Sequence, residues 1–336
     1  MTEPVAKVQR LAYVRVGAPD FGQAERFLER FGLQVQYRSA ERVYYRGTDP
    51  EPPCYVLGEG RGGVEAIAFE AASYEDLETL SRLEGASPVE ASGDPAGGYL
   101  VRLVDPAGMT VEVVWGQDSG EALNPALPHA FNMDGQRARE GELPRIEQGA
   151  SRVKRLGHLV LESADPAGLF DWYHKYFGLM ISDAVRLPDQ SPQMIFARLD
   201  RSETYVDHHV IGFQWALDER TRVQHVAFEV SNLDDLMSGH DHLKGGAYKH
   251  VWGIGRHLLG GQIFDYWKSP FGLIHEHWTD TDLLNNKHQA QDCQLADMKD
   301  YWGPEPTPAF LIARWNFKVV KNLFRLLKAR SMAKKA

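Results

Sequence analysis

One strand near the end of the chain carries a carboxylate that needs a partner. In the stretch "LIHEHW", the alternation of side chains along a strand sends Glu276 to the face opposite His275 and His277. Apolar residues flank it, and a buried carboxylate is costly unless it is paired or binds a metal ion. Two more histidines, His158 and His225, fall on separate apolar strands. Because two imidazoles and one carboxylate are the donor set of non-haem Fe(II) oxygenases, we predict that His158, His225 and Glu276 bind a metal ion.

The chain repeats itself, and the repeat provides an internal control for this prediction. The stretch "LAYVRVGAPDFGQAERFLERFGLQV" from Leu11 resembles "LGHLVLESADPAGLFDWYHKYFGLMI" from Leu156. Similarly, "GVEAIAFEAASYEDLETL" from Gly63 resembles "RVQHVAFEVSNLDDLMSG" from Arg222. Each copy has the alternation of a strand followed by the start signals and period of a helix. We therefore interpret the chain as a duplicated domain with two modules in each half.

The two halves differ at the candidate ligand positions. Tyr13, Ala66 and Glu112 stand where the second half has its two histidines and Glu276. The first half cannot assemble the same donors, so we expect a metal ion in the second half alone. Two interpretations of the retained Glu112 stay open: it faces a small polar pocket, or it is a remnant of the duplication. For each histidine taken singly, a hydrogen-bonded role in the core is the alternative to a ligand role.

These modules predict an α+β fold. We expect four βαβββ modules in two domains, each domain an open mixed β-barrel with outer helices. Residues 1–120 form an N-terminal module pair without metal, residues 121–151 a linker, and residues 152–284 the catalytic module pair. Residues 285–336 form a C-terminal extension that ends in a basic helix. We expect this helix to cover its own domain, with a partner subunit or an anionic membrane surface as alternatives.

Composition and charge exclude several classes of function. The 336 residues carry a formal net charge of -9, which argues against a nucleic-acid-binding protein. Two cysteines offer neither a disulfide framework nor a cysteine zinc site, and they fit a reducing cytoplasm. We find no signal peptide and no apolar run of roughly 20 residues that would cross a bilayer. We therefore expect a cytoplasmic protein with no membrane span and no nucleic-acid partner.

The most specific phrase in the sequence runs from Gly255 to Glu276 and reads "GRHLLGGQIFDYWKSPFGLIHE". Together with most of the chain from Leu11 to Thr279, it resembles the type I extradiol ring-cleaving dioxygenases of the vicinal oxygen chelate superfamily. In that family a Gly-x-His, a Tyr, a Pro-x-Gly turn and the ligand Glu follow in this order. Asp265 and Ser269 depart from the family pattern, which puts the identity of the substrate in doubt. Asp265 precedes Tyr266, the Tyr of this pattern, and we expect it to reach a polar group of the substrate or to change the charge of the site.

The resemblance implies an activity and further site residues. The activity is O2-dependent meta-cleavage of a substituted, hydrophobic or bicyclic catechol to a muconic semialdehyde type product in aromatic degradation. Fe(II) is the implied cofactor, with Mn(II) as the alternative. His209, favoured over His208 by the apolar residues after it, stabilises the oxygen-derived anion and donates a proton. His257 and Tyr266 hydrogen-bond the catecholate oxygens.

The implied partners are a catechol and O2, and we expect a homo-oligomer. Two alternatives remain open at this point. One is a metal-dependent glyoxalase-type isomerase or epimerase of the same superfamily. The other is a non-enzymatic protein that sequesters a ligand. The loss of histidine at Tyr13 and Ala66 argues against the isomerase, and the retention of His158, His225 and Glu276 argues against the sequestering protein.

Overall fold

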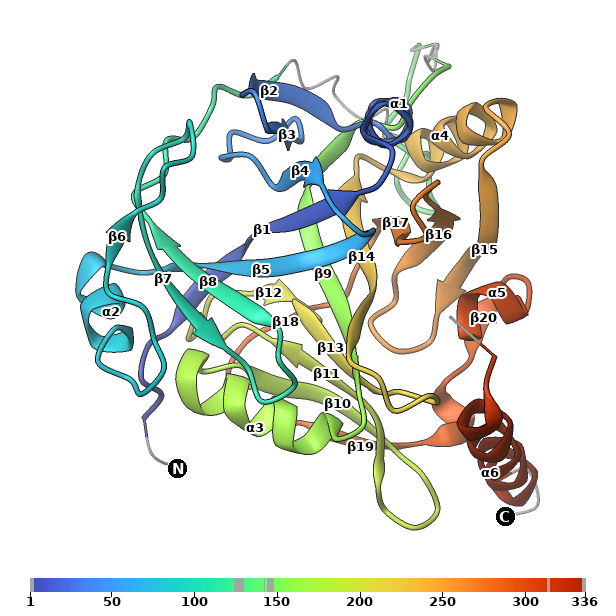
Figure 1. The fold of residues 1–336 in the computed structure, drawn as a ribbon. Helices are drawn as coiled ribbons and strands as arrows, with labels where there is room; N and C mark the ends of the chain where they lie inside the picture. Colours follow the sequence, from blue (N-terminus) through green and yellow to red (C-terminus); the bar gives the residue numbers. More distant parts are fainter. Residues whose placement is uncertain (1–2, 124–129, 142, 144–147, 313–314, 334–336) are drawn as a thin grey trace.

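The computed structural model describes residues 3–123, 130–141, 143, 148–312 and 315–333 of the chain. Two large mixed sheets with few helices build the fold (Figure 1), which confirms the predicted α+β class. Part of the expected linker, residues 124–129, 142 and 144–147, lies outside the described residues. The domain boundaries within the chain stay a prediction.

The first sheet consists of two strand groups that meet at its centre. Its strand order is β2-β3-β4-β1-β5-β8-β7-β6, with β1 and β5 antiparallel and β1–β4 and β5–β8 parallel. Helix α1 (Phe21–Phe31) belongs to the first group and α2 (Tyr74–Leu80) to the second. The strands are β1 (Val8–Ala18), β2 (Gln34–Arg38), β3 (Arg42–Arg46), β4 (Tyr55–Glu59), β5 (Gly63–Ala71), β6 (Glu90–Ala91), β7 (Tyr99–Val104) and β8 (Thr110–Trp115).

The second sheet repeats this order and adds a strand at each edge. Its order is β19-β10-β11-β13-β9-β14-β17-β16-β15-β20, and helices α3 (Pro166–Phe177) and α4 (Leu233–Gly245) accompany it. Strands β12 (Val206–Asp207) and β18 (Leu283–Leu284) pair separately. The strands of the large sheet are β9 (Val153–Ser163), β10 (Met180–Arg186), β11 (Pro192–Arg198), β13 (Ile211–Trp215), β14 (Arg222–Val230), β15 (Lys249–His257), β16 (Ile263–Lys268), β17 (Ile274–Thr279), β19 (Gln291–Gln294) and β20 (Asp300–Trp302).

The equivalence of the halves extends to single residues. Strands β1 and β9 have 11 residues each and the same sequence of buried and partly buried positions. Tyr13 pairs with Ala68 in the first sheet just as His158 pairs with Ala227 in the second. Helices α1 and α3 each begin after an Asp whose side chain caps the first turn, and each ends at a Gly in the left-handed region. The predicted duplication is therefore confirmed in both sheets.

Helix α1 of the first half packs against strand β17 of the second. The Phe31 ring stacks on His277 at a centroid distance of 3.8 Å, and the Phe27 ring meets His275 edge-on at 5.0 Å. Both histidines are fully buried in this junction. The predicted alternation along β17 is confirmed, because these histidines face α1 while Glu276 lies on the opposite face of the strand. The junction thus fixes β17, the strand that carries the candidate ligand.

The C-terminal extension wraps the second half. Strands β19 and β20 add one strand to each edge of its sheet. The extension also contains a 3-10 helix (Leu295–Asp297) and helix α5 (Pro308–Leu311). The expected terminal helix is α6 (Phe317–Ala333), which buries Val319 while Phe317 and Phe324 stay exposed. No helix in the described part of the chain is long and apolar enough to span a membrane.

An arginine neutralises the buried Glu112 of the first half. The Glu112 carboxylate accepts hydrogen bonds from Tyr13 Oη at 2.5 Å, Arg15 Nε at 2.7 Å and Arg102 Nε at 3.0 Å. Arg15 also donates to Asp94 Oδ2 at 2.5 Å, and both side chains are nearly buried. Glu112 therefore faces polar partners, as the first of its two interpretations states, and the second, a remnant of the duplication, stays open. A side-chain cation supplies the positive charge that this carboxylate requires.

We predict that Arg15→Leu lowers the free energy of unfolding by about 3–5 kcal/mol, because Asp94 loses its cation and the buried Glu112 is left with the half-exposed Arg102 alone. Chemical denaturation followed by circular dichroism measures the change. Arg38→Leu is the matched control, since Arg38 forms ion pairs at an exposed surface and should matter much less. Equal losses for the two variants would contradict the role given to the Arg15 network.

Candidate metal centre

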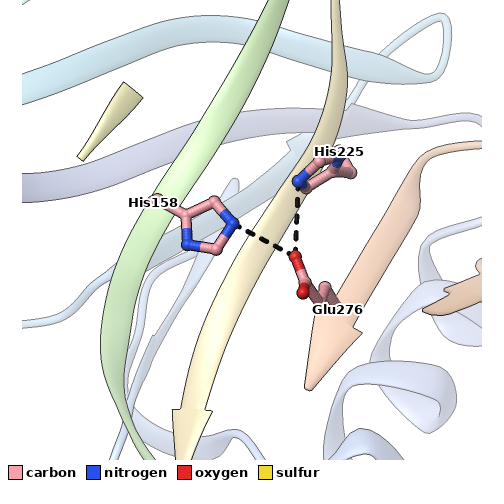
Figure 2. Close-up of side chains that lie close together, drawn as sticks. All are labelled: His158, His225 and Glu276. Carbon is pink, nitrogen blue, oxygen red and sulfur yellow. Dashed lines mark hydrogen bonds and ion pairs between the residues drawn. The ribbon is translucent and has the colours of Figure 1, made fainter. Parts of the chain in front are cut away.

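Three donor side chains converge from three strands of the second sheet. His158 comes from β9, His225 from β14 and Glu276 from β17, and one ligand atom from each lies within 4.8 Å of the others. Figure 2 shows both imidazoles pointing at the carboxylate. Glu276 Oε2 lies 3.1 Å from His158 Nε2 and 3.3 Å from His225 Nε2. The neighbouring positions of β9, β14 and β17 in the sheet place these residues side by side.

The hydrogen bonds of the described residues do not satisfy this buried cluster. The relative exposure of the three residues is 2%, 5% and 0% in chain order. His158 Nδ1, His225 Nε2 and Glu276 Oε1 have no hydrogen-bond partner among the described residues. Adjacent ligands of an octahedral ion with bonds of about 2.1 Å lie about 3 Å apart, which matches the observed N–O separations. The three residues therefore fit a divalent metal ion.

Their protonation states also suit a metal ion. Burial lowers the pKa of His225, which favours the neutral imidazole. Burial pushes the pKa of Glu276 upward, but the adjacent His158 and His225 outweigh burial and hold that pKa below its ordinary value. Metal ions bind neutral imidazole and ionised carboxylate. These directions favour neutral His225 and ionised Glu276, the forms that coordinate a metal ion.

His209 lies beside these donors, and His208 turns away from them. The His209 ring is buried, with its centroid 4.2 Å from that of His158. His208 Nδ1 lies 3.1 Å from His209 Nδ1, and His208 Nε2 lies 2.8 Å from Asp183 Oδ2. Burial and the neighbouring histidines lower the pKa of His209 well below its usual range. Of the two histidines, His209 is therefore the one that lies next to the cluster. The His208–Asp183 pair fixes the orientation of the His209 ring.

Tyr266 and His257 continue the site on the other side of the cluster. The Tyr266 ring lies 5.2 Å from that of His225, and its hydroxyl lies 3.2 Å from His257 Nε2. His257 Nδ1 in turn lies 2.9 Å from Asp300 Oδ1. Burial and the nearby Glu276 carboxylate raise the pKa of Tyr266 well above its ordinary value, so the phenol keeps its proton. A chain of hydrogen bonds therefore runs from Asp300 through His257 to Tyr266, whose ring lies beside the candidate ligand His225.

The expectation that Asp265 acts on the substrate is wrong. Asp265 and Tyr266 are successive residues of β16, so their side chains leave opposite faces of the sheet. Tyr266 faces the donor cluster, whereas the Asp265 carboxylate lies beneath helix α4 and contacts His240, His250 and Trp267. Alternation along the strand explains this placement.

Sequence reasoning missed two residues that hold site histidines in place. Asp300 belongs to β20 in the C-terminal extension, 43 positions after His257, and no local pattern links the two. Gln224 is different, because it precedes His225 directly and its Oε1 contacts His225 Nδ1. A polar residue beside a candidate ligand is a signal that the sequence does contain. Such outer partners fix the orientation of a ligand imidazole.

The fold agrees with comparisons to known proteins. Residues 155–276, which include all three candidate ligands, match the model of the Glyoxalase/Bleomycin resistance protein/Dioxygenase superfamily. This part of the chain therefore carries a domain that matches that superfamily, and the resemblance to extradiol dioxygenases is confirmed at this level. Two curated relatives are each 25% identical to the chain. One is Metapyrocatechase 2 of Cupriavidus necator, aligned over 92% of this chain and 93% of its own length. The other is an iron-dependent extradiol dioxygenase of Rhodococcus jostii (strain RHA1), aligned over 79% and 87%.

Solved structures share the fold across almost the whole chain. Homoprotocatechuate 2,3-dioxygenase from Brevibacterium fuscum superimposes with a TM-score of 0.76 at 17% identity, covering 92% of this chain and 93% of that one. The Mn(II)-bound glyoxalase from Novosphingobium aromaticivorans gives a TM-score of 0.74 at 23% identity, covering 91% and 95%. At these identities the likeness establishes the fold, so the chemistry has to be argued from the site.

We predict that His225→Ala loses one equivalent of Fe(II) per chain after anaerobic reconstitution, because two donors cannot hold the ion against buffer. Iron is measured by mass spectrometry after removal of loosely bound ion. His174→Ala is the control, since its ring lies on α3 and bonds the Leu179 carbonyl. Full iron content in His225→Ala would show that the ligand assignment is wrong.

Proposed function

We propose that the protein is an extradiol dioxygenase that opens the ring of a substituted, hydrophobic or bicyclic catechol to a muconic semialdehyde type product. The observation that carries the proposal is the convergence of His158, His225 and Glu276 on one buried point, where His225 Nε2 and Glu276 Oε1 have no hydrogen-bond partner among the described residues. The two dioxygenase relatives support the same reaction class. We assign Fe(II) as the cofactor, with Mn(II) as the alternative, because the donor set accepts both.

When bound, the metal ion holds the catechol oxygens and O2 together and relays electrons between them. The residues of the chain orient the substrate and manage the protons. Tyr266, which keeps its own proton, and His257 hydrogen-bond the catechol oxygens and fix which one of them stays protonated. On the other side, His209 donates a hydrogen bond to the negative charge that develops on oxygen, and it passes on a proton that it first takes from the catechol. The buried setting strengthens each of these interactions, because little water competes.

Aromatic side chains surround Tyr266 and His209, which favours a substrate with a ring. Trp252 stacks on Tyr266 with ring planes 10° apart and centroids 5.3 Å apart, and Phe310 of α5 lies 4.8 Å from Tyr266. Phe196 approaches His209 at 4.9 Å on the other side. Apolar and aromatic side chains with a few polar groups are the usual lining of small-molecule sites. The apolar composition favours a hydrophobic substituent on the catechol.

A glyoxalase-type isomerase is the second candidate, because a glyoxalase is among the structures that share this fold. The arrangement of donors argues against it. All three candidate ligands come from the second sheet, while Arg15 fills the corresponding place beside Glu112 in the first. The buried, unsatisfied donors likewise argue against a protein that only sequesters a ligand. A cytoplasmic location and a homo-oligomeric state stay predictions.

The deciding experiment supplies substrate to the anaerobic, Fe(II)-loaded protein and then admits air. Simple, biphenyl-type and carboxylated catechols are tested in parallel. We expect a yellow ring-fission product and uptake of one O2 per substrate, fastest with the hydrophobic catechols, and no product with His225→Ala. Turnover of methylglyoxal–glutathione hemithioacetal without any ring-fission product would replace the proposal by the isomerase.

We predict that Asp300→Asn lowers kcat/KM roughly 10-fold, because Asp300 orients His257 toward Tyr266. The variant should keep its iron and its melting temperature, and the pH profile of kcat/KM should shift, which a merely structural role would not cause. Asp300→Glu should restore part of the rate. An unchanged rate and pH profile in Asp300→Asn would remove Asp300 from the site.

A further inference from the structure

A second cluster of metal-binding side chains lies on the outer face of the second sheet. His240 comes from α4, His250 from β15 and Asp265 from β16, and one ligand atom from each lies within 4.8 Å of the others. Asp265 Oδ1 lies 2.7 Å from His250 Nε2, and Asp265 Oδ2 lies 3.1 Å from His240 Nδ1. Because Tyr266 leaves the other face of β16, this cluster is separated from the donor cluster by the sheet itself.

The fold does not require a polar residue where Asp265 lies. Its equivalent in the first half is Val101, at the same register one position before Arg102 as Asp265 is before Tyr266. Both Val101 and Asp265 have 0% exposure. A valine fills the position at no electrostatic cost, whereas a fully buried carboxylate needs a compensating positive charge. The second half therefore carries a costly group that its own duplicate shows to be dispensable for folding.

The positive charge beside Asp265 does not come from a lysine or an arginine. Within the described residues, the ion-pair partners of Asp265 are His240 and His250 alone. The Asp265 carboxylate raises the pKa of His240, so a protonated His240 is one possible source of this charge. A divalent cation bound by the same three groups supplies that charge at any pH at which the imidazoles are neutral.

We propose that His240, His250 and Asp265 form a second metal site, which binds a first-row divalent cation such as Zn(II). Two imidazoles and a carboxylate are suitable ligands for that ion. Trp267 Nε1 donates a hydrogen bond to Asp265 Oδ2 at 2.6 Å. Outer partners of this kind fix the orientation of a metal-binding carboxylate. The side chains of His240 and His250 are 17% and 32% exposed, which leaves an entry path and room for water as a further ligand.

The geometry assigns this site a structural function. Helix α4 supplies one ligand and the adjacent strands β15 and β16 supply the others, so the bound ion ties the helix to the sheet. Strand β16 carries Tyr266 on its inner face and β15 ends at His257. A tie at this point stabilises the strands that present both residues to the donor cluster. An ion that binds the folded chain but not the unfolded chain raises the stability of the fold by mass action.

The test is the Zn(II) stoichiometry of the tag-free, metal-depleted full-length chain, measured by equilibrium dialysis and elemental analysis. We expect two equivalents for the unaltered chain, one for His250→Ala, one for His225→Ala and none for the double variant. Asp265→Val, which installs the residue of the first half, should bind one. His242→Ala is the matched control, because His242 lies on the same helix outside the cluster, and it should keep two.

Thermal unfolding gives a second readout that does not depend on the donor cluster. Zn(II) should raise the melting temperature of His225→Ala but not that of His225→Ala/His250→Ala. The proposal is overturned if His225→Ala alone abolishes all binding, or if His250→Ala binds as much Zn(II) as the unaltered chain. Either result would make the cluster a network of protonated histidines around Asp265. Because His250 is partly exposed, its variant keeps the test valid even if Asp265→Val does not fold.

Discussion

Glu276 has no exposed surface, and a carboxylate in that position needs positive charge beside it. The duplicated fold places a glutamate at this same register in both sheets, so each half has to meet this requirement. The first half meets it with Arg15, whose guanidinium binds both Glu112 and Asp94. The second half has two imidazoles there instead, and their geometry fits a metal ion. The requirement for charge thus accounts for both the polar network around Glu112 and the candidate metal centre at Glu276.

The surrounding structure serves to hold the strand that carries Glu276. Its neighbours His275 and His277 are packed against α1 of the first half, so the two halves together fix β17. The C-terminal extension then adds strands to both edges of the second sheet and brings Asp300 and Phe310 to the site. The candidate metal centre therefore lies in one half, while α1 of the other half supports the strand that carries Glu276.

The sequence predicts those features that depend on local periodicity and on the repeat. The duplicated halves, the inward face of Glu276 and the absence of matching donors at Tyr13 and Ala66 all follow from strand alternation in aligned copies. The contact between Asp300 and His257 could not be predicted, since a short edge strand in the extension creates it. The sequence does predict the outward orientation of Asp265, because the alternation that turns Tyr266 toward the donor cluster turns its neighbour to the opposite face.

The central claim is that three side chains from three strands hold one cation with positions left for substrate. Anomalous diffraction from crystals loaded with Fe(II) under anaerobic conditions, recorded at the iron edge, tests it directly. The account predicts a peak about 2.1 Å from His158 Nε2, His225 Nε2 and a Glu276 oxygen, with further coordination positions taken by water. Density without an iron peak at this point, with the two imidazoles hydrogen-bonded to the carboxylate alone, would contradict it.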